Sequence, residues 1–139
     1  MSNYFQKIMI VDDDSVDRMI LKKLLIQVEL AEEIIEVETG YKALDILTAT
    51  GKQHESFPEL IFLDVNMPAM TGLEFLDVFI QLSRHYTSRC RIILVSSAEN
   101  DTDRQKSLQY HCVAGYFLKP ITMDLLLRLK ENLRQLNVS

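Results

Sequence analysis

The chain has 139 residues, of which 47% are hydrophobic and 25% are charged. This length and composition are typical of one globular domain, and they exclude a chain that is mainly disordered. The formal net charge is −5. Proteins that bind the nucleic-acid backbone are usually basic, so no direct nucleic-acid binding is expected. No apolar run approaches the roughly 18 residues of a membrane span, so no membrane insertion is expected either.

Two features bear on the compartment and on the domain organisation. Cys90 and Cys112 are the only cysteines, which is too few for a disulfide framework, and they are predicted to be free, half-buried thiols in a reducing cytosol. The N-terminus lacks the pattern of a signal peptide, so the predicted location is cytoplasmic. With no repeat and no linker, residues 1–139 are predicted to form a single domain with a core at about residues 6–136.

The first predicted elements are strands. Five short apolar runs, evenly spread along the chain, have the character of strands buried on both faces. They lie at residues 7–11, 34–38, 59–63, 91–95 and 115–118.

Segments with helical periodicity alternate with these strands. They lie at residues 15–28, 41–50, 72–86, 101–110 and 122–136. Ser15 and Thr122 are the predicted N-caps of the first and last helices. An apolar band is predicted on the first helix, at Val16, Met19, Ile20, Leu24 and Val28. A broader band, predicted to face the core, lies on the last helix at Ile121, Thr122, Leu125, Leu126, Leu129, Leu133 and Leu136.

This alternation predicts an α/β fold, a doubly wound parallel sheet of five strands with five helices. In such open sheets the binding site lies at the carboxyl ends of the strands. Polar residues, in one case with a proline after them, follow four of the five strands. They are Asp12, Asp13 and Asp14 after the first strand, Asp64 after the third, Ser96 and Ser97 after the fourth, and Lys119 and Pro120 after the fifth.

Any one of these residues could serve only as a helix cap, but together they come from distant segments and meet at one edge. Asp12, Asp13 and Asp64 would repel one another, and Mg²⁺ together with Lys119 would balance their three charges. Such a site suits an incoming phosphoryl group, with Ser96 donating to one of its oxygens. No serine, cysteine or histidine has an activating base beside it, so a carboxylate is the expected nucleophile.

Four motifs then carry a family resemblance. IMIVDDDS (8–15), FLDVNMPAMTG (62–72), ILVSSAE (93–99) and GYFLKP (115–120) occur in the order and at the spacing of a receiver domain. The chain therefore resembles, over essentially its whole length, the response-regulator receiver domains of two-component signalling, in particular the single-domain, chemotaxis-regulator-like ones. The resemblance implies a flavodoxin-like (βα)5 fold.

The resemblance also implies roles for individual residues. Asp64 would be the phosphoacceptor, and Ser96 and Lys119 would contact the phosphoryl group. The implied metal is Mg²⁺ (or Mn²⁺), with no other cofactor. Its ligands would be the carboxylates of Asp13 and Asp64, the backbone carbonyl of Asn66 and, through water, Asp12. Ser96 and Tyr116 would form the switch, and the Lys119–Pro120 peptide bond would be cis. Ala98 and Asn66 would occupy the positions that tune dephosphorylation in the family, and an alanine cannot orient a water there. Thr71 stands where an aspartate is common, but it should cap its helix equally well.

The implied function is that of a stand-alone response regulator without an output domain, and not of an enzyme beyond self-catalysed phosphotransfer and autodephosphorylation. A histidine kinase or a histidine phosphotransfer protein would be the donor. The helix at 101–110, the strand at 115–118 and the helix at 122–136 would signal to a downstream protein partner, and a homodimer through the same surface is a further option. Leu127 lies off the core band, and we expect it to be exposed and to contribute to such a contact.

Two alternatives remain open on the sequence alone. DDDSV (12–16) fits the motif of haloacid-dehalogenase-like phosphatases, with Asp12 as the nucleophile and Asp14 as the acid/base. That fold needs a further acidic pair at a strand end after the lysine, and only Asp124 and Glu131 follow, inside a predicted helix. The other alternative is a receiver-like interaction module that is never phosphorylated.

Overall fold

A single parallel sheet forms the centre of the molecule in the computed structural model, which describes residues 5–50, 57–82, 84–98 and 100–138. Its strands are β1 (Phe5–Val11), β2 (Ala31–Val37), β3 (Leu60–Asp64), β4 (Arg91–Ser96) and β5 (Val113–Leu118). They are ordered β2-β1-β3-β4-β5, and every neighbouring pair is parallel. The predicted five-stranded parallel sheet is confirmed.

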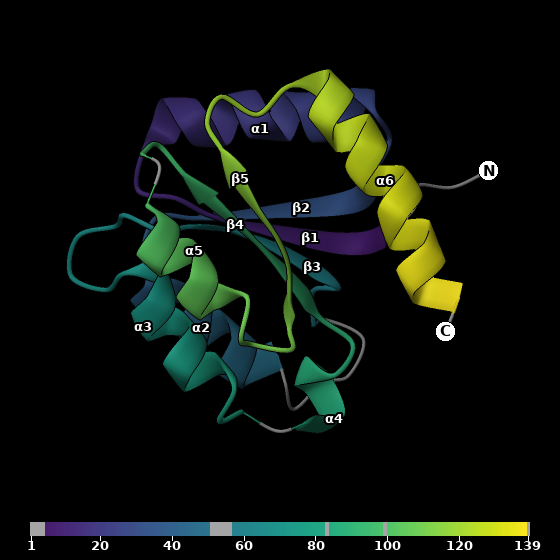
Figure 1. The fold of residues 1–139 in the computed structure, drawn as a ribbon. Coiled ribbons are helices and arrows are strands. Elements are labelled where there is room, and N and C mark those ends of the chain that lie inside the picture. Colours follow the sequence, from purple (N-terminus) through teal and green to yellow (C-terminus); the bar gives the residue numbers. More distant parts are fainter. Residues whose placement is uncertain (1–4, 51–56, 83, 99, 139) are drawn as a thin grey trace.

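Helices cover both faces of this sheet (Figure 1). They are α1 (Ser15–Gln27), α2 (Gly40–Thr50), α3 (Gly72–Phe79), the short α4 (Arg84–Thr87), α5 (Asp101–Ser107) and α6 (Met123–Val138). α1 and α6 lie on one face, and α2, α3 and α5 lie on the other. The fold is therefore doubly wound and flavodoxin-like, with five principal helices and one short additional helix. Within the described residues, no helix is long and apolar enough to cross a membrane.

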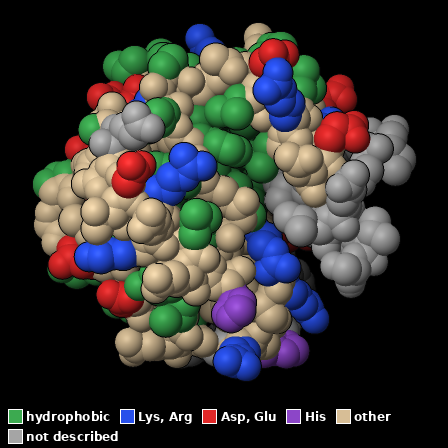
Figure 2. All heavy atoms as spheres, viewed as in Figure 1, with side chains coloured by type: hydrophobic (Ala, Val, Ile, Leu, Met, Phe, Trp, Pro, Cys, Tyr) green, Lys and Arg blue, Asp and Glu red, His purple; other side chains and the backbone are tan. Residues whose placement is uncertain are grey.

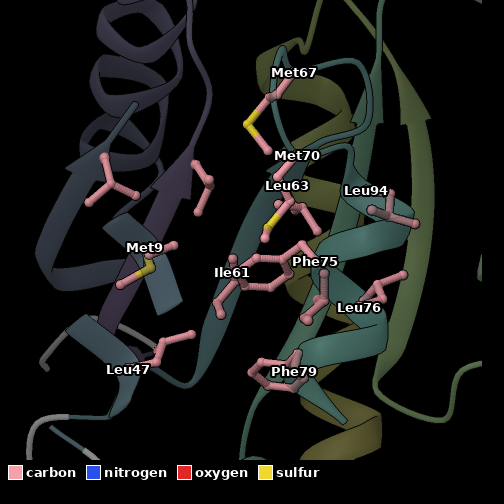
Figure 3. Close-up of a cluster of buried hydrophobic side chains, with 14 of the residues drawn as sticks. Met9, Leu47, Ile61, Leu63, Met67, Met70, Phe75, Leu76, Phe79 and Leu94 are labelled. Carbon is pink, nitrogen blue, oxygen red and sulfur yellow. The ribbon is translucent and has the colours of Figure 1, made fainter. Parts of the chain in front are cut away.

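The core has two layers because successive strand residues point to opposite faces of the sheet. Met9 of β1 packs in the layer beneath α2 and α3, while Ile8 packs in the layer beneath α1 and α6. On the first side, the Phe75 and Phe79 rings of α3 stack with centroids 5.9 Å apart. Figure 3 shows the Phe75 ring beside Ile61 of β3, with the Phe79 ring further along α3. Burial on both faces explains why the strands appear in the sequence as unbroken apolar runs.

The predicted helix at 72–86 is divided in the structure. α3 ends at Phe79 with Ile80 as its C-cap, and the chain turns before the four residues of α4 begin. The buried face of α3 consists of Gly72, Phe75, Leu76 and Phe79. Leu82, the next apolar residue, packs against the same core from beyond the end of the helix, so apolar spacing alone predicted a helix that continues past its C-cap.

The apolar band predicted on the first helix is wrong in its first half. Val16, Met19 and Ile20 are about half exposed, and α1 instead packs through Leu21 and Leu25. The helix carries apolar residues on two faces, and periodicity alone did not show which face meets the sheet. The predicted N-cap is wrong by one residue, because Asp14 caps α1 and Ser15 is its first helical residue.

The predictions for the C-terminal helix hold in part. Leu126 and Leu129 are buried, and Leu127 is 45% exposed, as expected from its place off the core band. Thr122 is exposed and not part of the core, and its Oγ1 accepts the N–H of Leu125, which confirms it as the cap of α6. The predicted core side chains of Leu133 and Leu136 lie outside the described part of the structure. Both cysteines are free, but Cys90 is fully buried rather than half-buried.

Candidate functional site

Three aspartates meet at the carboxyl edge of the sheet. Val11 of β1 pairs with Leu63 of β3, so the residues that follow them, Asp12 and Asp64, emerge side by side. Carboxylate oxygens of Asp12, Asp13 and Asp64 all lie within 4.8 Å of one another. Asp12 and Asp64 are buried and Asp13 is exposed. This group of carboxylates could bind a divalent metal ion, because hard cations prefer oxygen ligands.

Lys119, at the end of β5, brings a positive charge to these acids. Its Nζ lies 2.9 Å from Asp12 Oδ2, 2.7 Å from Asp17 Oδ2 and 3.7 Å from Asp64 Oδ2. Burial alone would lower the pKa of Lys119, but its hydrogen bonds to Asp17 and Asp12 raise that pKa overall. The lysine is therefore a fixed cation at neutral pH.

The carboxyl group of Asp64 lies in an environment that disfavours its charged form. Burial, followed by the neighbouring Asp12 carboxylate, raises the pKa of Asp64 to about 6. The charge of Lys119 and the N–H of Asn66, which donates to Asp64 Oδ1 over 3.3 Å, offset part of that effect. At neutral pH Asp64 is thus an ionised but poorly solvated carboxylate, which a cation or an electrophile would stabilise.

Asp17 is a member of this site that the sequence analysis missed. It lies in the first turn of α1 and forms the shortest contact to Lys119 Nζ. The signal in the sequence was its spacing: Asp17 follows Asp14 by three residues, so both lie in the same first turn of the helix. With Asp17 included there are four carboxylates, so Mg²⁺ and Lys119 would leave one negative charge. The predicted charge balance of zero is wrong for this reason.

The side chain of Asp14, in contrast, forms hydrogen bonds with the backbone of α1. Its Oδ1 accepts the N–H groups of Val16, over 2.8 Å, and of Asp17, over 3.1 Å. These two hydrogen bonds lower the pKa of Asp14. Asp14 therefore serves as the N-cap of α1, exposed at the start of that helix.

The hydroxyl group of Ser96 is buried at the end of β4, beside the acids. It donates to the Ala98 carbonyl over 2.7 Å and accepts from Asn66 Nδ2 over 3.2 Å. Ser96 is thus linked to the segment after β3, on which Asn66 follows Asp64 by two residues. Ser97, in comparison, is exposed.

The loop between β3 and α3 is held tightly against the site. Gly72 donates its N–H to the Val65 carbonyl over 2.9 Å. A Cβ at Gly72 would lie only 3.0 Å from Val65 Cα and 3.1 Å from the Asp64 carbonyl oxygen. Thr71 caps α3 in a reciprocal pair of hydrogen bonds with Glu74, so this threonine caps the helix as predicted.

Two further predicted residues lie on β5 and just beyond it. Tyr116 is partly buried, and its hydroxyl is buried without a hydrogen-bond partner among the described residues. The Lys119–Pro120 peptide bond is cis.

The described surface has two hollows, one at each end of the strands. A cavity of about 380 Å³ adjoins the acids, and Asp17, Asp64, Lys119 and Ile20 are among its lining residues. A larger groove of about 1060 Å³ lies at the opposite ends of the strands and contains none of the four acids. The smaller cavity is therefore the one that belongs to this site.

The sequence profile of the response regulator receiver domain matches residues 8–130. The chain belongs to this family. Receiver domains are signalling domains of two-component systems, so the family assignment confirms the predicted class and fold.

Three similar proteins illustrate the relationship. An uncharacterized response regulatory protein of Staphylococcus epidermidis is 31% identical over 116 residues, and the match covers 83% of this chain. The chain spans only 41% of that relative's length. A two component response regulator from Cytophaga hutchinsonii has a TM-score of 0.86 at 25% identity, covering 96% of this chain and 99% of that one. The Mn²⁺-bound form of response regulator Rcp1 has a TM-score of 0.71 at 26% identity, covering 91% and 90%.

Proposed function

We propose that this receiver domain accepts a phosphoryl group from phosphohistidine onto Asp64, and that the modification alters the α5–β5–α6 surface. The observation that carries the proposal is the cluster of Asp12, Asp13 and Asp64 with Lys119 Nζ 3.7 Å from Asp64 Oδ2. The donor would be a histidine kinase or a histidine phosphotransfer protein. Action as a stand-alone regulator on a downstream partner stays a prediction from the sequence.

The donor set fits Mg²⁺ (or Mn²⁺) better than metals that prefer nitrogen or sulfur ligands, such as Zn²⁺ and Cu²⁺. All the grouped ligand atoms are carboxylate oxygens, and no histidine or cysteine joins them among the described residues. Asp13 and Asp64 would hold the ion through carboxylates, Asn66 through its backbone carbonyl, and Asp12 through water. When bound, Mg²⁺ would neutralise charge on the carboxylates and on the transferring phosphoryl oxygens.

In the transfer, an oxygen of the Asp64 carboxylate forms a bond to phosphorus as the phosphorus–nitrogen bond of the donor breaks. The bond electrons return to the donor imidazole. Lys119 stabilises one phosphoryl oxygen, because it is already charged and lies beside Asp64. Ser96 donates to another oxygen once its hydroxyl leaves the Ala98 carbonyl.

The proposed switch begins with that exchange of hydrogen bonds. In the structure Ser96 Oγ is 2.7 Å from the Ala98 carbonyl, so moving toward a phosphoryl group breaks one contact and forms another. Tyr116 lies on the neighbouring strand, opposite Leu94 of β4. Its hydroxyl is buried without a hydrogen-bond partner among the described residues. This supports a second position of the Tyr116 side chain, in which the hydroxyl forms a hydrogen bond.

Two exposed apolar areas support a division between donor and partner surfaces. Val16, Met19 and Ile20 of α1 are exposed, and Ile20 lines the cavity beside Asp64, which suits a docking donor. On the other area, viewed in Figure 2, hydrophobic side chains reach the surface among charged ones. The large hydrophobic residues exposed in this area are Leu108, which is the C-cap of α5, Leu118 of β5, and Met123 and Leu127 of α6. Such areas are typical of interaction sites.

Intact-mass spectrometry after incubation with acetyl phosphate tests this proposal. We expect one phosphoryl adduct on the wild-type protein with Mg²⁺, little without it, and none on Asp64→Asn. Absence of an adduct on a protein that binds Mg²⁺ would favour the unphosphorylated interaction module instead.

The phosphatase alternative receives no support from the geometry. That mechanism requires the Asp14 side chain as a free acid/base, but its Oδ1 accepts hydrogen bonds from the backbone N–H groups of Val16 and Asp17. The family assignment also favours the receiver function.

A further inference from the structure

The contact between Asp17 and Lys119 has no role in the transfer described above. Lys119 Nζ is closer to Asp17 Oδ2, at 2.7 Å, than to either of the other two carboxylates that it approaches. An ammonium group has three N–H donors. Two of them are used by Asp17 and Asp12, and the distance to Asp64 exceeds that of a hydrogen bond.

The two ends of this ion pair come from different parts of the fold. Asp17 lies in the first turn of α1, and Lys119 follows β5, 102 residues later. The Asp17 side chain is 38% exposed, whereas that of Lys119 is 17% exposed. Asp17 is therefore at the rim of the site. Its carboxylate can leave Lys119 and be solvated by water more easily than the buried carboxylate of Asp12 can.

We propose that Asp17 is a positioning residue that restrains Lys119 in the unphosphorylated state and thereby opposes phosphorylation. This inference rests on the proposed function, because it assigns a regulator to the same site. Asp17 competes with the phosphoryl group for Lys119, so the Asp17–Lys119 ion pair has to break before the lysine can contact the phosphoryl oxygens.

Removal of the Asp17 charge should therefore ease entry of a phosphoryl group. Asp17→Asn keeps the size of the side chain but weakens its hold on the ammonium group. Lys119 then becomes free to contact Asp64 and its modification. We expect beryllofluoride, a stable analogue of the phosphoryl group, to bind Asp17→Asn about three to ten times more tightly with Mg²⁺ present.

Asp14→Asn is a matched control. It removes a carboxylate from the same turn of the chain, and asparagine is as good an N-cap as aspartate. The Asp14 side chain accepts its hydrogen bonds from backbone N–H groups, not from Lys119. If proximity of charge alone mattered, the two variants would behave alike, whereas the proposal predicts a clear effect only for Asp17→Asn.

A double-mutant cycle separates positioning from a general structural role. Beryllofluoride affinity and the initial rate of labelling by acetyl phosphate are measured for wild type, Asp17→Asn, Lys119→Ala and the double variant. We expect the gain from Asp17→Asn to disappear in the Lys119→Ala background. A gain that persists without the lysine, or an affinity of Asp17→Asn equal to or below that of wild type, would overturn the inference.

The wild-type protein shows whether the proposed function itself fails or only the role of Asp17. If the wild-type protein neither binds beryllofluoride nor takes up a phosphoryl group, the proposed function fails, and this inference fails with it. If the wild type does both and Asp17→Asn gains nothing, only the role of Asp17 is wrong.

Discussion

At the scale of single residues, the Asp64 carboxylate opposes folding while it prepares the site for a cation. Its pKa is raised from 3.8 to about 6, chiefly by burial. When the pKa of a carboxyl group is higher in the folded than in the unfolded state, ionisation of that group lowers the free energy of unfolding. Stability is therefore lost as pH rises from about 4 through about 6, and the penalty remains at neutral pH.

Asp64→Asn should for this reason stabilise the metal-free protein. We expect its free energy of unfolding at pH 7 to exceed that of wild type by about 1–3 kcal/mol, and the difference to vanish below about pH 4. Urea unfolding in the presence of a chelator, repeated across this pH range, measures the difference. A variant less stable than wild type at pH 7 would show that the Asp64 charge is already well compensated by Lys119.

Lys119 should matter more for the response than for the covalent step. Lys119→Ala removes the link between the phosphoryl group and β5, so labelling of Asp64 should persist while the change at α5–β5–α6 becomes incomplete. Amide chemical shifts on addition of beryllofluoride report that change. Lys130→Ala is the control, because Lys130 Nζ donates to the Val28 carbonyl, away from the site. Full wild-type shifts in Lys119→Ala would contradict the assigned role.

Residue types at strand ends were enough to predict most of this site. Asp12, Asp13, Asp64 and Lys119 meet as expected because parallel strands deliver their carboxyl ends to one edge. Asp17 was not predicted, because its place depends on how α1 is rotated against the sheet. That rotation follows from packing of Leu21 and Leu25, which periodicity did not distinguish from the exposed stripe.

At the scale of elements, the connection from β3 to α3 depends on close backbone approach. Gly72 begins α3 with its Cα against the main chain of Asp64 and Val65. Backbone atoms cannot move aside as a flexible side chain can. The position of the phosphoacceptor is therefore coupled to the packing of the helix that follows it.

Gly72→Ala should consequently reduce stability by about 1–3 kcal/mol, even though alanine favours helices. Gly115→Ala is a suitable control, since a Cβ there would meet only side-chain atoms, at 3.4 Å or more. Thermal or urea unfolding of both variants compares them directly. Equal stabilities would mean that the β3–α3 loop shifts without strain.

Element types were predictable, and their boundaries less so. β2 begins at Ala31, three residues before its predicted start, although Glu32 and Glu33 are charged and exposed. β2 lies at the edge of the sheet, where charged side chains are tolerated and even useful. Its position at the edge is a property of the whole topology, which a local pattern of residues does not contain.

At the scale of the whole molecule, the acidic site links stability to divalent cations. Mg²⁺ that binds only the folded state should stabilise the protein, by about 2.7 kcal/mol at a concentration one hundred times its dissociation constant. Thermal unfolding with increasing MgCl₂ measures this effect, with Asp13→Asn expected to lose it and Asp14→Asn to keep it. An equal response of both variants would place the bound ion elsewhere.

The central claim is that Asp64, and no other carboxylate, accepts the phosphoryl group. Borohydride reduces an aspartyl phosphate to homoserine, so treatment of the labelled protein followed by peptide mass spectrometry marks the acceptor. We predict homoserine at position 64 in the wild type. Homoserine at Asp12, or conversion that persists in Asp64→Asn, would contradict the account.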